Sequence, residues 1–422
     1  MRRMSDSGVV WVGDIPVDWN MGRVRNSFCA VKDIVGDRVD EFERLALTLE
    51  GVVKRSFDER GGLQPEEFEG YQILRKNELV FKLIDLKNVH TSRIGRCGFD
   101  SGIVSPAYIV LREKSGNDTR FAEYYFLALW LNEIFNVLGD DAVRSCLNRT
   151  ELLGLPYPHL SLTEQLKIAN YLDSQCAEID AAMRDAKQIV EEFKTYKKSL
   201  VNEAVTGKNL KGKKVASGQD WLGEIPATWD VRRIVNLYRE VSERGDDSLP
   251  ILSVSINTGV SDKELSDEEQ ERVFIRSEDK TKYKRVQPGD LTYNMMRAWQ
   301  GAFGAVRVNG MVSPAYVVAR PKVEMDSRYV EYLLRSPNAT REMQRYSRGI
   351  ADFRLRLYWP EFKNIRIPCP PLEEQKRIAD MLDEKCGEID AIIADKELLI
   401  ADLETYKKSL IFEVVTGKRE VA

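Results

Sequence analysis

Histidine is scarce in this sequence, which has only His90 and His159 among 422 residues. Two histidines this far apart exclude a His-x-x-x-His metal pair and any multi-histidine metal centre. A Ser/His/Asp arrangement needs only one histidine, but no Gly-x-Ser-x-Gly turn accompanies either of them. The six cysteines are scattered and include no Cys-x-x-Cys pair. We therefore expect reduced thiols, with neither a disulfide framework nor a zinc cluster.

Long apolar runs and a dominant charge are also missing. No apolar run reaches 18 residues, and the first residues lack the apolar stretch of a signal peptide, so we expect no membrane partner. Lys and Arg total 63 against 67 Asp and Glu, a net charge of −4. This balance excludes a globally basic nucleic-acid binder but leaves a local basic face open. A hydrophobic content of 43 % can fill sizeable cores, and the length indicates more than one domain.

What the sequence does contain is a long internal repeat. Trp-x-Gly-x-Ile-Pro-x-x-Trp at 11–19 recurs at 221–229, and Val-Ser-Pro-Ala-Tyr at 104–108 recurs at 312–316. The stretch 162–208 shares 24 of 47 positions with 372–418. Residues 20–102 align with almost nothing in the second copy. The pattern predicts a shared framework with two different inserts, and neutral drift after duplication is the alternative.

The matched stretches predict two long helices whose apolar residues follow the alternating three-and-four spacing of a coiled-coil seam. Ser161 and Glu164 form a capping box, Pro370–Pro371 opens the second helix, and Gly207 and Gly417 end the two helices. So long a helix must bury its stripe against a partner, and we expect antiparallel pairing within the chain, giving a pseudo-two-fold dumbbell. An ordinary core helix in each domain and a coiled coil between chains are the alternatives. The predicted seam consists of Ile168, Leu172, Ile179, Ile189, Phe193, Leu200, Ile378, Leu382, Ile389, Leu399, Leu403 and Leu410.

The other segments mix helix and strand signals. Strand patterns occur at 72–74, 79–83, 107–111 and 315–319, and helix patterns at 121–138 and 328–334. We predict duplicated α/β (α+β) domains with partly antiparallel sheets, joined by the two helices. The predicted partition is a domain at 1–160, a helix at 161–208, a basic linker at 209–220, a domain at 221–370 and a helix at 371–418.

Basic residues concentrate in the second domain. Residues 295–370 hold 13 basic and 6 acidic side chains, and most of the basic ones are arginine. Arginine offers a planar fork to phosphate and to guanine. Aromatic residues such as Trp299, Tyr346 and Trp359 are interleaved. The segment predicts a DNA-facing surface, with a solvated basic face as the alternative.

Motifs of a catalytic centre are missing too. The Thr-Gly-Lys tripeptides at 206–208 and 416–418 lack the upstream glycine and the following Ser or Thr of a phosphate loop. No Gly-x-Gly-x-x-Gly follows a strand, and neither Asn-Pro-Pro-Tyr nor Asp-Pro-Pro-Tyr occurs. We therefore predict a non-catalytic chain with no metal site and no cofactor of its own.

Taken together, these motifs resemble the specificity subunits of type I restriction–modification systems over nearly the whole chain. The resemblance rests on both Trp-x-Gly-x-Ile-Pro-x-x-Trp motifs, both Val-Ser-Pro-Ala-Tyr strands, both long helices and the segment 289–301. It implies two target-recognition domains, each recognising half of a bipartite site in double-stranded DNA, and a helical spacer that docks two methyltransferase subunits. It further implies that the methyltransferase uses S-adenosylmethionine to make N6-methyladenine. Motor and nuclease (restriction) subunits with ATP and Mg would complete a phage-defence enzyme in the cytoplasm of a bacterium or archaeon.

Candidate DNA contacts are predicted in both domains. Residues 82–90 of the first domain take the place of 294–300 in the second but differ from them in sequence. The candidates are Lys82, Lys87, Asn88, His90 and Arg93 in the first domain, and Arg297, Gln300, Arg345, Arg348 and Arg354 in the second. The four tryptophans of the duplicated motif, Trp11, Trp19, Trp221 and Trp229, are expected to be packing anchors.

Two other classes of protein stay open. A coiled-coil adaptor presenting two protein-binding domains would carry an apolar patch in place of the arginine-rich run. A self-contained nuclease or methyltransferase would be indicated if this chain alone bound S-adenosylmethionine.

Overall fold

The computed structural model describes residues 2–59, 67–84, 86, 93–114, 116–138, 146–246, 248–256, 258–263, 282–349 and 355–421. Unit 1 comprises Met1–Ala186 and Leu398–Ala422, and unit 2 comprises Lys187–Glu397. Each of the two long helices contributes one part to each unit.

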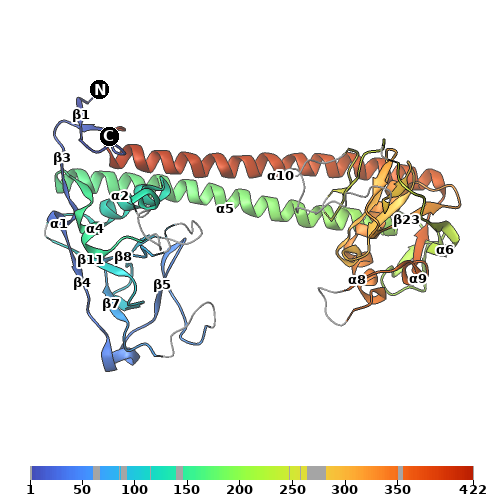
Figure 1. The fold of residues 1–422 in the computed structure, drawn as a ribbon, viewed down its shortest axis with the longest axis horizontal. Helices are drawn as coiled ribbons and strands as arrows, with labels where there is room; N and C mark the ends of the chain where they lie inside the picture. Colours follow the sequence, from blue (N-terminus) through green and yellow to red (C-terminus); the bar gives the residue numbers. More distant parts are fainter. Residues whose placement is uncertain are drawn as a thin grey trace. The chain divides into compact units, whose positions relative to one another are not determined.

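Two helices dominate the chain: α5 (Leu162–Thr206) and α10 (Leu372–Val415) (Figure 1). Gly207 and Gly417 follow them with φ of 69° and 70°, the left-handed conformation that ends a helix. After α5 the Lys208 N–H donates to the Glu203 carbonyl over 2.9 Å, as in a Schellman motif. At its start the Ser161 hydroxyl accepts from the Glu164 N–H over 3.3 Å, while the Glu164 carboxylate binds Arg2.

The two helices pair antiparallel within each unit. In unit 1 Leu172 shares a core with Leu410, and Lys407 Nζ lies 2.7 Å from an Asp180 oxygen. In unit 2 Leu382 shares a core with Val205, and Lys197 Nζ lies 2.6 Å from an Asp390 oxygen. An early part of one helix thus faces a late part of the other in both units. The predicted pairing is confirmed there, and the pseudo-two-fold dumbbell stays a prediction.

Burial along the seam follows the prediction with one exception. Leu399 is 41 % exposed, so the prediction for this residue is wrong. A straight α-helix drifts by ~20° per heptad relative to a 3.5-residue repeat, so a stripe continued by spacing alone leaves the contact face. Val190, which the spacing missed, is 5 % exposed. The buried predicted positions are Ile168, Leu172, Ile179, Ile378, Leu382, Ile389 and Leu410, and the half-buried ones are Ile189, Phe193, Leu200 and Leu403.

The remaining elements of unit 1 precede α5. Its strands are β1 (Met4–Asp6), β2 (Asp14–Pro16), β3 (Asn20–Arg23), β4 (Phe28–Val31), β5 (Leu45–Thr48), β6 (Gly51–Lys54), β7 (Gln72–Arg75), β8 (Leu79–Phe81), β9 (Ile94–Arg96), β10 (Ser101–Val104), β11 (Ile109–Glu113) and β12 (Pro156–His159). Its helices are α1 (Val24–Ser27), η1 (Gly36–Glu41), α2 (Thr119–Leu131), α3 (Ile134–Leu138) and α4 (Arg149–Gly154).

The remaining elements of unit 2 lie between α5 and α10. Its strands are β13 (Lys214–Ala216), β14 (Glu224–Pro226), β15 (Asp230–Arg233), β16 (Tyr238–Val241), β17 (Val254–Ser255), β18 (Gly259–Val260), β19 (Lys284–Val286), β20 (Leu291–Asn294), β21 (Phe303–Ala305), β22 (Gly310–Val312), β23 (Tyr316–Pro321) and β24 (Arg366–Cys369). Its helices are α6 (Ile234–Leu237), η3 (Ala298–Gln300), α7 (Ser327–Arg335), α8 (Pro337–Tyr346) and α9 (Trp359–Phe362).

The two units have the same sheet topology. The four-stranded sheet runs β4-β11-β8-β9 in unit 1 and β16-β23-β20-β21 in unit 2, with every neighbouring pair antiparallel. The smaller pairs correspond as well, for example β10-β7 with β22-β19. The inserts that hardly align in sequence therefore share one fold. The predicted mixed α/β domains, duplicated and joined by two long helices, are confirmed.

The period-2 alternation of the central strands separates two cores in each unit. Leu79 and Phe81 of β8 enter the core that contains α2 and the start of α5, and Val80 enters a smaller core with Leu45 of β5. In β23, Val317 and Ala319 face the α7 core while Val318 faces the opposite one. Full burial of each such side chain contributes about 1.5–3 kcal/mol.

The tryptophan motifs receive the ends of the long helices. Trp19 and Trp229 are 3 % and 4 % exposed. A Cβ at Gly417 would come within 2.4 Å of Pro16, and one at Gly207 within 2.5 Å of Pro226. Each helix end therefore packs on the motif of the other copy, which confirms that these two tryptophans are packing anchors. No helix within the described ranges is both long and apolar enough to cross a membrane.

Candidate nucleic-acid interface

The predicted arginine-rich loop of unit 2 is held by its own polar contacts. Arg297 Nε donates to Gln300 Oε1 over 3.1 Å, and Trp299 Nε1 donates to the Met296 carbonyl over 3.1 Å. Gly301, with φ of 94°, turns the chain from η3 into β21. The loop therefore presents Arg297 and Gln300 from a defined backbone.

A second segment brings more arginines to this loop. Arg348 and Arg356 form an antiparallel bridge with backbone hydrogen bonds of 2.8 and 2.9 Å, so their side chains lie on the same side. The Leu357 N–H donates to the Met295 carbonyl over 2.9 Å and ties the bridge to the loop. Helix α8, which carries Arg345 in its last turn, packs against η3. We call Arg297, Gln300, Arg345, Arg348 and Arg356 the basic face of unit 2.

Buried carboxylates hold two of these arginines while leaving them open to solvent. Arg345 pairs with Glu342 over 3.0 Å and Arg348 with Glu361 over 2.5 Å. The arginine side chains are 67 % and 74 % exposed, whereas the glutamates are 7 % and 14 % exposed. A guanidinium has five N–H donors, so each keeps donors for another partner.

The structure thus brings together Arg297, Gln300, Arg345 and Arg348 of the prediction, and Arg354 lies outside the described residues. The prediction missed Arg356, which is exposed. The sequence did indicate this residue: Arg356 lies two residues after Arg354, and alternate residues of an extended segment share a face.

The corresponding loop of unit 1 has an equivalent backbone contact but different side chains. The Leu147 N–H donates to the Leu83 carbonyl over 3.0 Å, as Leu357 does to Met295 in unit 2. Lys82 is half-buried at the end of β8. Lys87, Asn88 and His90 lie outside the described residues.

Arg93 is not placed to contact DNA, which corrects the prediction for this residue. It is 1 % exposed, and its Nη1 donates to the Ile84 carbonyl over 2.8 Å. The Lys82 N–H donates to the Arg93 carbonyl, as Asn294 does to Ala302, so Arg93 occupies the place of a buried alanine. The sequence shows that the loop is positively charged, but it does not show which arginine the backbone carbonyls surround.

A second duplicated cluster, missed in the sequence, fastens each α/β domain to a long helix. In unit 2 Arg328 Nη1 lies 2.8 Å from Asp383 Oδ2, and the Tyr332 hydroxyl donates to Asp383 Oδ1 over 2.7 Å. In unit 1 Arg120 and Tyr124 contact Asp173, each over 2.9 Å. Burial, together with the hydrogen bond to Asp383, raises the pKa of Tyr332.

A buried glutamine completes each cluster. Gln375 accepts from the Asp326 N–H over 3.1 Å and donates to the Pro370 carbonyl over 2.8 Å. Gln165 makes the same two contacts with Asp118 and Leu160. We call these sets the joints: Asp118, Arg120, Tyr124, Gln165 and Asp173 in unit 1, and Asp326, Arg328, Tyr332, Gln375 and Asp383 in unit 2.

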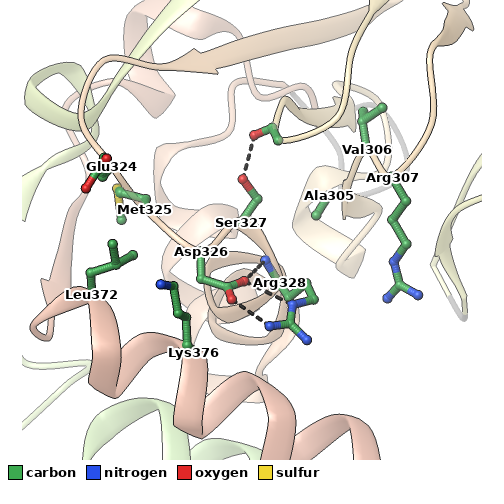
Figure 2. Close-up of a pocket in the computed structure, with 11 residues that line it drawn as sticks. Ala305, Val306, Arg307, Glu324, Met325, Asp326, Ser327, Arg328, Leu372 and Lys376 are labelled. Atoms are coloured by element: carbon green, nitrogen blue, oxygen red, sulfur yellow. Dashed lines mark hydrogen bonds and ion pairs between the residues drawn. The ribbon is translucent and has the colours of Figure 1, made fainter.

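Figure 2 shows a pocket beside the unit 2 joint, with two residues of the joint, Asp326 and Arg328, hydrogen-bonded to each other near Leu372 and Lys376. The pocket has a volume of about 550 Å³. Ser327 Oγ donates to the Gly289 carbonyl over 2.5 Å on its wall. Within the part of the chain that the structure describes, no group of three or more His, Cys, Asp or Glu could hold a metal ion.

Comparison with known proteins agrees with this architecture. Residues 243–397, which include the basic face, match the family described as "Type I restriction modification DNA specificity domain". The resemblance to type I specificity subunits is confirmed. A putative type I restriction enzyme MjaX specificity subunit of Methanocaldococcus jannaschii is 23 % identical over 97 % of this chain and 96 % of that protein.

Solved structures share the fold of this chain. A chain from a structure on complex assembly and conformational transition of the type I R-M system has a TM-score of 0.67 at 15 % identity, covering 96 % of this chain and 99 % of that one. The HsdS subunit of Thermoanaerobacter tengcongensis has a TM-score of 0.51 at 15 % identity, covering 96 % and 98 %.

Proposed function

We propose that this chain is the DNA-binding specificity subunit of a type I restriction–modification complex. Each α/β domain recognises one half of a bipartite duplex site. The chain itself is non-catalytic and directs two methyltransferase subunits, and through them the restriction subunits, to that site. S-adenosylmethionine, ATP and Mg belong to those partners.

The observation that carries the proposal is the basic face of unit 2. It presents four arginines and a glutamine from a backbone fixed by hydrogen bonds. Arginine and glutamine are suited to recognise guanine and adenine edges in the major groove, and arginine also binds phosphate. The face lies within the segment that matches the family.

The alternative is a coiled-coil adaptor that presents two protein-binding domains. Such a surface would be apolar at its centre and depleted in charge. Arginine also occurs in protein interfaces, so what favours DNA is the grouping of four arginines with a glutamine in place of an apolar patch.

The test is selection of duplexes from a random-sequence library by the chain in complex with its methyltransferase partner. We expect enriched duplexes to share two short half-sites separated by a fixed number of variable base pairs. Recovery of no common sequence would overturn the proposal. In a matched selection, Lys385→Ala, an exposed change on α10, should recover the wild-type sequence, and Arg297→Ala with Gln300→Ala should lose one half-site only.

A further inference from the structure

The joints hold the same positions in both units although the domains they fasten have diverged. Arg120 and Arg328 each connect an N-cap aspartate of the domain to an aspartate of the long helix. In each unit a tyrosine one turn further along binds the second oxygen of that helix aspartate. One difference is that Arg120 also contacts Asn170, where Arg328 contacts Asp380.

This arrangement is suited to fix the angle between the α/β domain and the long helix. Apolar packing is non-directional and allows a helix to rotate or slide on its neighbour. The joint adds directional bonds at two separate places on α10, Gln375 and Asp383. Eight residues separate these places, or ~12 Å at 1.5 Å per residue. Two fixed points so far apart oppose rotation of the domain about either one.

The contribution of the Arg328–Asp383 ion pair to stability is small by comparison. The Arg328 and Asp383 side chains are 33 % and 36 % exposed. Ion pairs with this much solvent access contribute about 0–1 kcal/mol. Retention of this ion pair in both copies is therefore better explained by orientation than by stability.

We propose that Asp173 and Asp383, with Tyr124 and Tyr332, are positioning residues that set the register of the two half-sites. This inference rests on the proposed function. A domain of ~150 residues has a radius of gyration of ~15 Å, so its loops lie roughly 20 Å from such a joint. A rotation of about 10° would then move a loop by about 3.5 Å, close to the 3.4 Å step between base pairs. Spacer length is accordingly set by the joint angles as well as by helix length.

The test measures discrimination between spacers by the complex of the chain with its methyltransferase. Equilibrium affinities are compared for three duplexes with the same half-sites and a spacer of the native length, one base pair shorter, or one longer. We expect Asp383→Asn and Tyr332→Phe to reduce the preference for the native spacer at least fivefold. Affinity for the native duplex should fall less than threefold. The control is Asp395→Asn, an exposed change on the same helix, which should keep the wild-type preference.

Thermal melting shows whether a variant has lost its fold or only the positioning of its domain. Tyr332→Phe removes a single oxygen atom, so it keeps the test valid if Asp383→Asn unfolds. A wild-type spacer preference in a folded Tyr332→Phe variant would overturn the inference while leaving the proposed function intact. A wild-type complex without any sequence or spacer preference would overturn both.

Discussion

Arg320 of β23 holds both carboxylate oxygens of Asp290, from Nε to Oδ1 over 2.9 Å and from Nη2 to Oδ2 over 3.0 Å. Asp290 is fully buried and also accepts from the Gln287 N–H over 3.1 Å, which closes the turn before β20. In unit 1 Arg112 Nε donates to Glu78 over 2.7 Å at the corresponding place. One ion pair therefore ties a turn to the neighbouring strand in each unit.

Removing one partner of this pair should strongly destabilise unit 2. Asp290→Ala leaves the Arg320 guanidinium, 12 % exposed, with the half-exposed Glu243 in place of its buried carboxylate. We expect a loss of about 3 kcal/mol in the free energy of unfolding, measured in urea. Asp262→Ala, an exposed change in the same unit, is the control. A loss no larger than that of the control would show that the pair is not a structural determinant.

The helix ends should be intolerant of a side chain. At Gly207 an alanine would adopt a left-handed conformation and place its Cβ 2.5 Å from Pro226. Left-handed strain alone costs about 1–2 kcal/mol, and the overlap adds to it. Gly223→Ala, with φ of +67° and open space around the Cβ, isolates the strain. Equal melting temperatures for the two variants would contradict the packing of the helix end on the tryptophan motif.

Gly387→Ala should stabilise the chain. Gly387 is an exposed residue inside α10, and a Cβ there meets no atom within 4 Å. Alanine favours the helix by about 1 kcal/mol over glycine, so the melting temperature should rise. A fall would show that α10 is locally distorted at this position.

The basic face should contribute charge to DNA binding. Arg348→Ala and Arg356→Ala should each weaken binding about tenfold at moderate salt. If the arginine contacts a phosphate, the slope of log affinity against log salt should also become shallower by about 0.9. Filter binding over a salt series measures both effects. Lys385→Ala on α10 should change neither, and unaltered affinity and slope would remove the tested arginine from the interface.

Alkaline pH should destabilise the folded chain in part through the joints. Burial raises the pKa of Tyr332 and of Tyr124 above the ordinary value of 10.0. The unfolded chain therefore releases these protons first, and their contribution to stability, complete below pH 10, is lost as the pH rises further. Unfolding free energy measured between pH 8 and 11 should fall less steeply for Tyr332→Phe than for wild type. Tyr196→Phe, a change of an exposed tyrosine on α5, is the control. A Tyr332→Phe curve identical to that of wild type would contradict the effect of burial on the Tyr332 hydroxyl.

The long helices were accessible from sequence because their signals are local. Capping by Ser161, the glycine at 207 and apolar spacing together predict α5 from its own residues. The sheets were less accessible, because β8 lies between β9 and β11, strands that are not both its neighbours in sequence. The common fold of the two inserts could not be predicted from their sequences either. Antiparallel pairing constrains the backbone register more than the identity of the residues, so two unlike sequences can form the same sheet.

The candidate site was predictable in part. Arginine density located the basic face of unit 2, but burial of Arg93 depends on carbonyl groups that only the folded loop brings together. The joints did have a sequence signal: Asp118, Arg120 and Tyr124 recur 208 residues later as Asp326, Arg328 and Tyr332. The repeat is easily overlooked because these residues are dispersed along a helix and because their partners lie on another one.

Comparing genome-wide N6-methyladenine in the host with that in a strain lacking this chain tests the central claim most directly. The account predicts loss of one bipartite methylated motif, whose two half-sites are separated by a constant spacer. A second strain carrying Arg297→Ala with Gln300→Ala should lose or relax only one half of that motif. A methylome that is the same with and without the chain, in a host where the chain co-purifies with an active methyltransferase, would contradict the assignment of DNA specificity to this protein.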